Sequence, residues 1–530
     1  MVSETRSLNP SIFTSADALA GMAKRRSEAV ALRFPESNQT LTFSEWHAHS
    51  LRLAGGLMSL GLRPGDHLAL LAENRIEWPV VQGAAALMGA VLVPLNTHYR
   101  RDDLKFVLTQ SRARAIVLSP RFRSNEYLEH VQALRNSLPS LEFVVLLEGE
   151  VPGCVSYAEL LESALPDRLP KVKPGDVGSL QYTSGTTGFP KGALLTHEGM
   201  LKNAFATARR LGLKPTDKWT SIIPLFHCAG CVMNLLGCLQ AGACYVGVSH
   251  FDPELMFKTI EAERCTVLTG VPTSYLAMLE HSERGRYDLS SLRTGTCGGA
   301  DTDAEVLRRC AKSFPIPYVA QVYGQTEAST LIACPRFDDP KRFETAGEPL
   351  EGYQVRISDV SSGEVLKAGA TGQIEARGAM VMRGYFEDDK ATAEVLTEDG
   401  WLKTGDLGYL DAEGRLVIAG GRLRDLIIRG GENIYPVEIE NHLRTHPAVL
   451  EIAVFGLPDR YYGEVVAAAV QLREPVDAAA LAKHCAAAIA KFKVPARWFS
   501  VDEFPMTSSG KVRKVALREL AEGGELEVLS

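Results

Sequence analysis

Residues 182–192 read YTSGTTGFPKG, and this stretch is the most informative part of the chain. It follows an apolar run at residues 177–180, which predicts a strand leading into a loop. Glycines in the loop permit close backbone approach, its hydroxyl side chains can donate hydrogen bonds, and Lys191 adds a positive charge. A polyphosphate needs many donors and charge neutralisation, so the stretch predicts a polyphosphate-binding loop. It differs from the P-loop of ATPases, because Pro190 precedes the lysine where that motif has glycine.

Short apolar strands and helical segments alternate on the C-terminal side of this loop. Strands are expected at residues 219–223, 243–248, 266–268, 292–297 and 318–321. Helices are expected at residues 231–240, 253–263, 272–283 and 301–313. Alternation of this kind is typical of parallel sheets covered by helices. On the N-terminal side, the apolar run at residues 83–95 is 13 residues long, shorter than the roughly 20 that span a membrane. It predicts a buried helix running into a strand.

The pattern changes after about residue 345, where half-buried strands separated by turn residues predict a β-rich subdomain. Residues 411–414 are typical of a hairpin turn within it. From about Arg422 the chain has a βα pattern of its own, with helices expected at residues 436–444 and 478–491 and strands at 450–455 and 465–472. This last segment is long enough to fold as a separate small domain.

Composition excludes several classes of protein. Of the 530 residues, 45% are hydrophobic and 23% charged, which is ordinary for a globular protein. Asp plus Glu number 64 and Lys plus Arg 57, and the net charge of −7 argues against a nucleic-acid-binding protein. The N-terminal residues lack the apolar centre of a secretory signal, and the C-terminal residues match neither a lipidation box nor a peroxisomal address. We therefore expect a cytoplasmic protein with ten free cysteines. The close pair Cys228 and Cys231 is interpreted as two small side chains facing the interior, since no second ligand cluster accompanies it.

Eight motifs in order resemble the adenylate-forming acyl-CoA synthetases, a family grouped with luciferases and peptide-synthetase adenylation domains. After the loop at residues 182–192 they are PLFH at 224–227, GGA at 298–300, YGQTE at 323–327, WLKTGD at 401–406, GRLRD at 421–425, GGENIYP at 430–436 and SGKVR at 509–513. One of these motifs alone would carry little weight. Their order and spacing over essentially the whole chain make the resemblance specific.

The resemblance and the strand pattern together imply an α/β protein. Residues 1–421 are expected to form a large N-terminal domain of two βα-layered sheets plus a β-rich subdomain, which holds ATP and the acyl group. Residues 422–530 are expected to form a small α+β C-terminal domain that moves as a lid. The hinge is assigned to Arg424, where many relatives carry Asp or Lys.

The resemblance also implies a two-step ligase reaction. A carboxylate attacks the α-phosphate of ATP, which gives an acyl-adenylate and pyrophosphate, and the thiol of coenzyme A then displaces AMP after the small domain rotates. Mg²⁺ is expected as cofactor with Glu327 as its ligand, since a hard cation prefers carboxylate oxygen. Lys511 is expected to bridge the attacking carboxylate and the α-phosphate, and Thr326 to bond that phosphate. These three residues and His227 form the expected catalytic set.

The expected nucleotide contacts follow from the same motifs. The β- and γ-phosphates are assigned to the loop residues Thr183, Ser184, Gly185, Thr186, Thr187 and Lys191. The adenosine is assigned to Gly298, Gly299, Ala300, Tyr323, Gln325, Asp406 and Arg422, with the adenine between the glycines and Tyr323 and the ribose hydroxyls on Asp406. The pantetheine arm of coenzyme A is assigned to a tunnel lined by Gly430 and Gly431.

The acyl pocket is assigned to Phe226, His227, Cys228, Gly230, Cys231, Gly298 and Gln321. His227 is interpreted as a wall or aromatic gate rather than a base. The segment after it is small and apolar, and no Lys or Arg occurs between Lys218 and Lys258. A second substrate carboxylate would need a positive partner, so a malonate-type acid is disfavoured and a fatty, alicyclic or aryl acid is expected.

Three alternatives stay open beside the carboxylate:CoA ligase. The first is a freestanding adenylation enzyme that loads a separate carrier protein, since no fused carrier domain is expected after Lys511. The second is a luciferase-like oxygenase with the same motifs, and the third is a non-enzymatic binding module. The residues at 434–436 resemble the CoA-using branch more than the amino-acid-activating branch. A homodimer is possible, and neither nucleic acid nor an integral membrane segment is expected.

Overall fold

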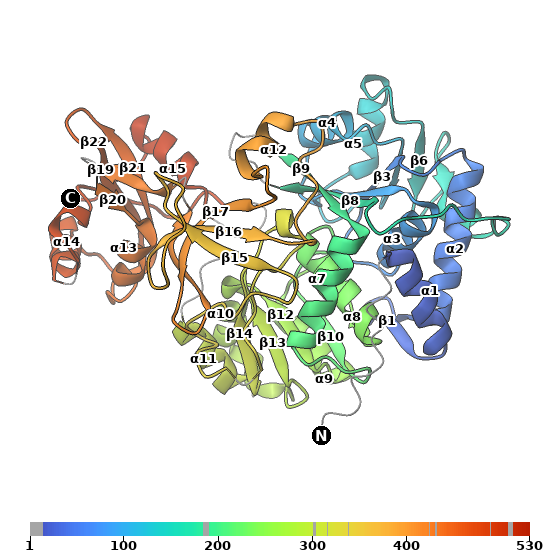
Figure 1. Cartoon of the computed structure of the whole chain (residues 1–530), viewed down its shortest axis with the longest axis horizontal. Helices are drawn as coiled ribbons and strands as arrows, with labels where there is room; N and C mark the ends of the chain where they lie inside the picture. The colour runs from blue at the N-terminus through green and yellow to red at the C-terminus, as the bar shows by residue number, and fades with distance from the viewer. Residues whose placement is uncertain are drawn as a thin grey trace. The chain divides into compact units, whose positions relative to one another are not determined.

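The computed structural model describes residues 14–183, 190–299, 304–314, 316–337, 339–422, 425–429, 432–487, 489–506 and 512–530 (Figure 1). The chain divides into two compact units. The first consists of Met1–Gln354 and Ala376–Leu402, and the second of Val355–Glu375 and Lys403–Ser530.

One sheet of the first unit holds the hairpin that frames the glycine-rich loop. Its strands, in spatial order, are β7 (Val155–Ser156), β6 (Phe143–Leu146), β5 (Ala115–Leu118), β3 (His67–Leu71), β4 (Val91–Pro94), β8 (Val177–Thr183) and β9 (Lys191–Thr196). All neighbours pair in parallel except β8 and β9, which form an antiparallel hairpin. The β-branched and leucine-rich strands pack under α4 (Arg101–Gln110) and α5 (Tyr127–Leu134), where Leu104, Val107 and Val131 are fully buried.

The second sheet of the first unit is also mostly parallel. Its order is β14 (Tyr318–Gln321), β13 (Thr294–Cys297), β12 (Val267–Gly270), β10 (Lys218–Ser221), β11 (Cys244–Val246), β1 (Val30–Phe34) and β2 (Gln39–Thr42). Only the β1–β2 pair is antiparallel. Helices α9 (Pro253–Glu263), α10 (Pro272–Glu280) and α11 (Ala304–Ser313) lie beside this sheet (Figure 1). Their apolar side chains share one buried core with its strands.

Further helices complete the first unit. They are α1 (Ser15–Arg25), α2 (Phe43–Ser59), α3 (Glu77–Met88), α6 (Tyr157–Leu161), α7 (His197–Arg210), α8 (Gly237–Ala241) and α12 (Asp389–Val395). Local sequence explains where several begin. Thr42 and Glu45 form a reciprocal capping box at α2, and Asp252 caps α9 just before Pro253.

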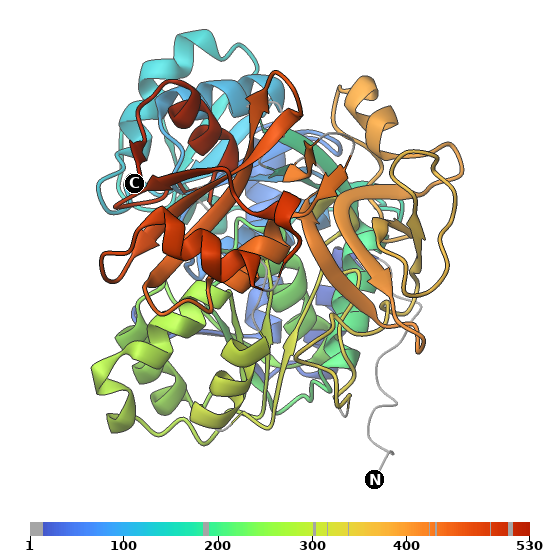
Figure 2. The same ribbon diagram turned by 90° about the vertical axis from the view of Figure 1, so that its left-hand side faces the viewer.

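The second unit contains a small antiparallel sheet and a mixed one. The first comprises most of β15 (Gln354–Ser358), β16 (Gly372–Arg377), β17 (Leu402–Leu410) and β18 (Leu416–Arg422). The second, drawn in orange to red in Figure 2, comprises β19 (Ile427–Arg429), β20 (Glu432–Ile434), β21 (Val449–Asp459), β22 (Gly463–Leu472), β23 (Arg497–Ser500) and β24 (Glu527–Val528). Helices α13 (Pro436–Leu443) and α14 (Ala478–Ala486) share one core with this sheet, and α15 (Lys514–Glu522) joins another.

The expected α/β class, with two βα-layered sheets, a β-rich part and a small α+β part, is confirmed. Helix α9 and strand β14 have the predicted bounds. The apolar run at residues 83–95 is the end of a buried helix followed by a strand, and the ten cysteines are free thiols, as expected. Among the described residues, no helix is long and apolar enough to cross a membrane.

Three helix predictions were wrong in detail. The helix expected at residues 231–240 is a π-helix, η3 (Ala229–Leu236), continued by the short α8. The helix expected at residues 272–283 ends at Glu280 and is followed by a 3₁₀ segment at Ser282–Arg286. The helix expected at residues 478–491 ends at Ala486, although alanine-rich sequence favours helix by propensity. Propensity is a weak guide where tertiary contacts decide the end of a helix.

The π-helix has an identifiable tertiary cause. In the amide orientation that satisfies both ends of its side chain, Asn234 donates to the Ala229 carbonyl and accepts from Trp219 Nε1 at 3.0 Å and Ser221 Oγ at 3.2 Å. This side chain ties the widened turn to strand β10. π-Helical turns are rare and occur mostly near functional sites.

Candidate functional site

The carboxyl ends of three parallel strands bring predicted nucleotide residues together. Gly270, Cys297 and Gln321 end β12, β13 and β14 and are aligned across the sheet. Ligands bind at this edge in open α/β sheets. The segments that continue from the last two strands carry the predicted adenine residues, and the Val322 N–H donates to the Cys297 carbonyl at 2.9 Å.

Gly298 and Gly299 form a surface without side chains at this edge. A Cβ atom at Gly298 would lie 2.7 Å from Val322 Cγ2 and 2.9 Å from the Val322 carbonyl oxygen, so a larger residue does not fit without movement. Gly299 has φ of +83°, which favours glycine. Tyr323 is buried, and its backbone pairs with Ala333. The structure therefore places these glycines and Tyr323 on adjacent strand ends, while Ala300 lies outside the described residues.

Glu327 is held by a residue that the sequence analysis missed. Thr326 and Glu327 lie in a 3₁₀ turn, η5 (Thr326–Ala328), shortly after β14. The Tyr385 hydroxyl donates to Glu327 Oε1 at 2.8 Å, and Lys191 Nζ lies 5.4 Å from the centroid of the Tyr385 ring. Tyr385 thus lies between the expected phosphate-binding cation and the expected metal ligand.

Tyr385 reaches this place because its segment adds to the edge of the first sheet. The Arg383 N–H donates to the Leu194 carbonyl, the Leu194 N–H to the Gly384 carbonyl, and the Phe386 N–H to the Gly192 carbonyl. Partners so far apart in the sequence leave no local signal, so spacing alone could not have identified Tyr385.

Backbone strain directly follows Glu327. Ser329 has φ of +52° and Thr330 has φ of +136°, which is unusual for residues other than glycine. The Ser329 hydroxyl donates to the Met380 carbonyl at 2.7 Å, and the Thr330 hydroxyl donates to the Cys228 carbonyl at 3.3 Å. Strained residues persist where surrounding contacts over-determine them, and they cluster at functional sites.

Residues 226–231 form the predicted acyl wall, and Cys228 in this wall contacts a predicted adenylation residue. Its Sγ lies 3.4 Å from the Thr326 hydroxyl oxygen, and burial raises the pKa of the Cys228 thiol to about 11. Cys231 is equally buried, its sulfur accepts from Gln181 Nε2 at 3.2 Å, and burial likewise raises the pKa of its thiol. Two neutral thiols facing the interior agree with the sequence interpretation and give this wall an apolar character.

The turn before η3 fixes the rest of the wall. His227 is exposed, Phe226 is half-buried, and His227 Nδ1 accepts from the Ala229 N–H at 3.1 Å. A Cβ atom at Gly230 would lie 2.2 Å from the Pro224 carbonyl oxygen, so only glycine fits. The predicted pocket residues of this segment therefore lie in one tight turn and the first turn of the π-helix.

Asp406 lies in the second unit. It is 8% exposed, on β17, and pairs in register with Arg422 on β18. The backbone thus brings the two predicted ribose residues to opposite positions on neighbouring strands. Gln325, in the first unit, is extended at the entrance to η5.

The remaining predicted residues flank or lie within segments that are not described. Thr183 and Lys191 pair at the end of the β8–β9 hairpin, so the ends of the glycine-rich loop meet. The predictions that lie outside the described residues concern Ser184, Gly185, Thr186, Thr187, Arg424, Gly430, Gly431 and Lys511.

Comparisons with known proteins agree on one family. The family model described as AMP-binding enzyme matches residues 19–386, and the model of the C-terminal domain of the same enzymes matches residues 438–511. YngI of Bacillus subtilis (strain 168), which carries the name of an acyl-CoA synthetase, is 38% identical over 514 residues, with 92% of this chain and 93% of that protein covered. The mitochondrial medium-chain acyl-CoA ligase ACSF2 of Danio rerio is 33% identical over 531 residues, with 95% and 88% covered.

Among solved structures, the anthranilate CoA ligase AuaEII in complex with anthranoyl-AMP has a TM-score of 0.88. It is 27% identical, and the match covers 97% of this chain and 98% of that one.

Proposed function

Because the chain belongs to the AMP-binding enzyme family and is an AMP-forming acyl-CoA ligase, we propose that it activates an apolar carboxylic acid, fatty, alicyclic or aryl, for transfer to coenzyme A. The observation that carries the proposal is the buried Cys228 thiol in the predicted acyl pocket, whose Sγ lies 3.4 Å from the Thr326 hydroxyl oxygen. An apolar acid next to an α-phosphate is what such an arrangement accommodates.

The nucleotide residues keep the roles that the motifs imply. Gly298, Gly299 and Tyr323 hold the adenine, Asp406 and Arg422 the ribose, and the loop from Thr183 to Lys191 the β- and γ-phosphates. The backbone adjacency of the glycines and Tyr323 supports the first of these roles. The register pair of Asp406 and Arg422 supports the second.

Glu327 has the chemistry of a magnesium ligand. Its hydrogen-bond donor at Tyr385 is a neutral hydroxyl, so this contact orients the carboxylate without neutralising its negative charge. Bound there, Mg²⁺ would neutralise phosphate charge on ATP. Lys191 Nζ lies 5.4 Å from the Tyr385 ring centroid, so its cation contacts the ring rather than the Glu327 carboxylate that the Tyr385 hydroxyl bonds.

The adenylation step brings two anions together, and cationic groups offset their repulsion. Lys511 is proposed to bridge the carboxylate and the α-phosphate, and Thr326 to donate to that phosphate. His227 is proposed as a gate of the acyl pocket rather than a base, since its Nδ1 already accepts from the Ala229 N–H.

The thioester step is proposed to use a second orientation of the C-terminal domain. We propose residues 1–421 and 422–530 as the two functional domains, with Arg424 as the hinge and Gly430 and Gly431 lining the pantetheine tunnel. The matching of separate family models to residues 19–386 and 438–511 supports a division in this part of the chain.

The acceptor, assembly and location are finer points of the proposal. Coenzyme A is the proposed acceptor, and a separate carrier protein is the alternative. A cytoplasmic location and a homodimer are proposed on the sequence alone.

The test is pyrophosphate release measured over a panel of carboxylic acids, with and without coenzyme A. The proposal expects release with medium-chain, alicyclic or aryl acids, little with malonate, and thioester formation without any carrier protein. Turnover that requires a carrier protein would instead establish the alternative acceptor. Malonate as the best acid would overturn the apolar-pocket assignment.

A further inference from the structure

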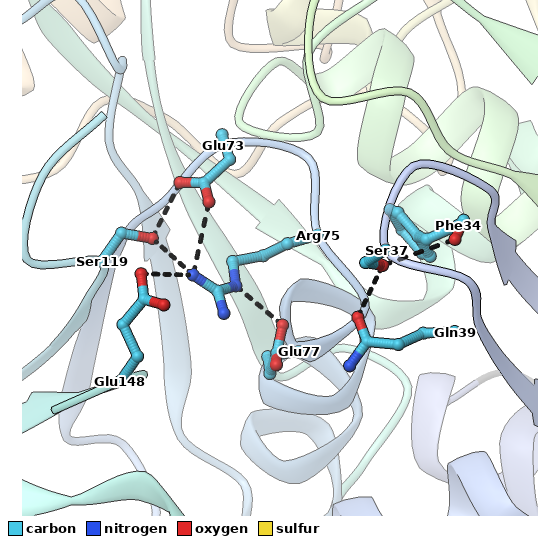
Figure 3. Close-up of polar contacts among 8 residues, drawn as sticks. All are labelled: Phe34, Ser37, Gln39, Glu73, Arg75, Glu77, Ser119 and Glu148. Carbon is cyan, nitrogen blue, oxygen red and sulfur yellow. Dashed lines mark hydrogen bonds and ion pairs between the residues drawn. The ribbon is translucent and has the colours of Figure 1, made fainter. Parts of the chain in front are cut away.

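The loop between β3 and α3 carries an ion network centred on Arg75 (Figure 3). Arg75 Nε donates to Glu77 Oε2 at 2.7 Å, and Nη1 lies 3.3 Å from Glu73 Oε1 and 3.4 Å from Glu148 Oε1. Nη1 also donates to the Ser119 hydroxyl at 3.2 Å, which in turn donates to Glu73 Oε2 at 2.7 Å. The guanidinium therefore ties its loop to the segments that follow β5 and β6.

This network is partly buried and strongly charged. Burial alone would lower the pKa of the Arg75 guanidinium, but the hydrogen bond and charge of Glu77, with the charges of Glu73 and Glu148, raise it above its usual value. The side chains of Arg75, Glu73 and Glu77 are 15–18% exposed. Charged pairs at such depth hold their geometry better than exposed pairs do.

The residue next to Arg75 reaches the other sheet. Asn74 is 7% exposed, and its Oδ1 accepts from the Leu225 N–H at 2.7 Å. Leu225 is fully buried and lies between Pro224 and Phe226 in the predicted acyl gate. Because β3 belongs to the first sheet and β10 leads into the gate from the second, this hydrogen bond connects the two sheets at the acyl wall.

A shift of Leu225 would displace the neighbouring residues of the predicted acyl pocket, because they belong to the same tight turn. The His227 N–H donates to the Pro224 carbonyl at 3.0 Å, and that carbonyl oxygen lies against Gly230 so closely that no Cβ atom fits between. Gly230 is followed by Cys231, whose thiol faces Gln181. The turn at residues 224–231 is thus a close-packed unit fixed on one side by Asn74.

From these contacts we propose that Asn74, held by the Arg75 network, is a positioning residue that sets the acyl wall and so the affinity for the acid. The inference rests on the proposed function, because it needs an acid bound at residues 226–231. It assigns no contact between Asn74 and the substrate.

The test compares variants by steady-state kinetics with the acid and ATP varied separately. Asn74→Ala leaves the buried Leu225 N–H without its acceptor, and the KM for the acid is expected to rise about 10-fold while the KM for ATP changes less than about 2-fold. Asn74→Asp keeps an acceptor oxygen in place, and its KM for the acid is expected to stay within about 3-fold of the wild type. The order of preference among acids of the panel should change in Asn74→Ala alone.

Asn125→Ala is the matched control. Asn125 is a buried asparagine of the same unit, 8% exposed, and its Nδ2 donates to the Thr97 carbonyl, which also accepts from Tyr127. Its loss is expected to lower thermal stability without a selective rise in the KM for the acid.

Arg75→Met is a second test variant, which leaves Asn74 in place. It keeps the test decisive if Asn74→Ala does not fold. It is expected to raise the KM for the acid in the same direction but by less. An unchanged KM for the acid in the folded variants, or equal rises in the two KM values, would overturn the inference. If the wild type makes no acyl-CoA from any acid of the panel, the proposed function fails, and this inference fails with it. If the wild type is active and the variants keep its KM for the acid, this inference alone is refuted.

Discussion

The proposed nucleotide side and the proposed acyl side are built by different means. On the predicted nucleotide side, Gly298, Gly299 and Tyr323 come shortly after strand ends, and glycines or backbone strain shape the surface. On the acyl side, the wall takes its shape from residues outside any motif, among them Asn74 against Leu225, Gln181 against Cys231, and Asn234 within the π-helix.

This difference indicates that the nucleotide side determines the reaction rate and the acyl side determines which acid binds. Charge and backbone on the nucleotide side serve the step that is common to the family, in which electrostatic stabilisation dominates. The acyl side needs only shape and polarity that fit one class of acid, and shape depends on tertiary support. We therefore expect substitutions on the nucleotide side to lower the rate, and those on the acyl side to change the KM for the acid and the choice of acid.

The largest expected effect is that of Lys511→Ala. Removing a cation that stabilises charge in the transition state is expected to lower pyrophosphate release by about 10²–10³-fold. Transfer of the acyl group from supplied acyl-adenylate to coenzyme A should remain largely intact, since that step does not join two anions. Equal loss of both half-reactions would contradict the role assigned to Lys511.

Tyr385→Phe is expected to act on magnesium use. Phenylalanine keeps the ring beneath Lys191 but removes the hydroxyl that donates to Glu327. A hydrogen bond to a charged group is worth about 1.5–3 kcal/mol, so the Mg²⁺ concentration that gives half-maximal rate should rise about 10-fold or more. Calorimetric titration of ATP with and without Mg²⁺ provides a reading that does not depend on turnover.

Tyr318→Phe is the control for that experiment. Tyr318 is a buried tyrosine of the same unit whose hydroxyl donates to the Pro335 carbonyl at 2.6 Å. If the Mg²⁺ concentration that gives half-maximal rate rises equally in both variants, Tyr385 acts on the fold rather than on Glu327.

The sequence was sufficient to predict the fold class, and its motifs identified the residues that are proposed for the nucleotide side. Strand ends such as Gln321 and glycines such as Gly298 are marked locally, by alternation and by motif, and the structure brings them to one sheet edge. Tyr385, Asn74 and Asn234 carry no such mark, because each acts through a partner on another element. The helix at residues 231–240 was predicted without its π-helical turn for the same reason, since apolar periodicity does not report a side chain that fills the widened turn.

Gly230→Ala tests whether the tight turn at residues 224–231 shapes the acyl side. The added methyl group would meet the Pro224 carbonyl oxygen at 2.2 Å, and a backbone atom cannot rotate away. Overpacking of this kind lowers the free energy of unfolding by about 1–3 kcal/mol, and the displaced turn should raise the KM for the acid several-fold. Gly285→Ala is the control, because a Cβ atom there has no neighbour within 4 Å. A KM for ATP that rises as much as the KM for the acid would show that the turn serves both sides.

The smallest expected effect is that of Asn234→Leu, and it tests whether the π-helix itself shapes the pocket. Leucine has a similar volume but cannot bond the Ala229 carbonyl or accept from Ser221. Trp219 Nε1 keeps its bond to Thr269 at 2.9 Å, so β10 should lose little of its own support. An unmade hydrogen bond at a buried carbonyl costs about 1–3 kcal/mol, and relaxation of the widened turn toward an α-helix would recover part of it.

That relaxation would rotate the side chains after Cys231 relative to those before it, and the preferred length or ring size of the acid should shift by a few-fold. The rate with saturating acid should change little, because the contacts of Asn234 are with Ala229, Ser221 and Trp219, none of which has a proposed catalytic role. An unchanged acid preference, measured over the same panel with stability lowered as expected, would mean that the π-helix supports the fold without selecting the substrate. Selectivity would then be set by the turn at residues 224–231, where Asn74 and Gly230 act.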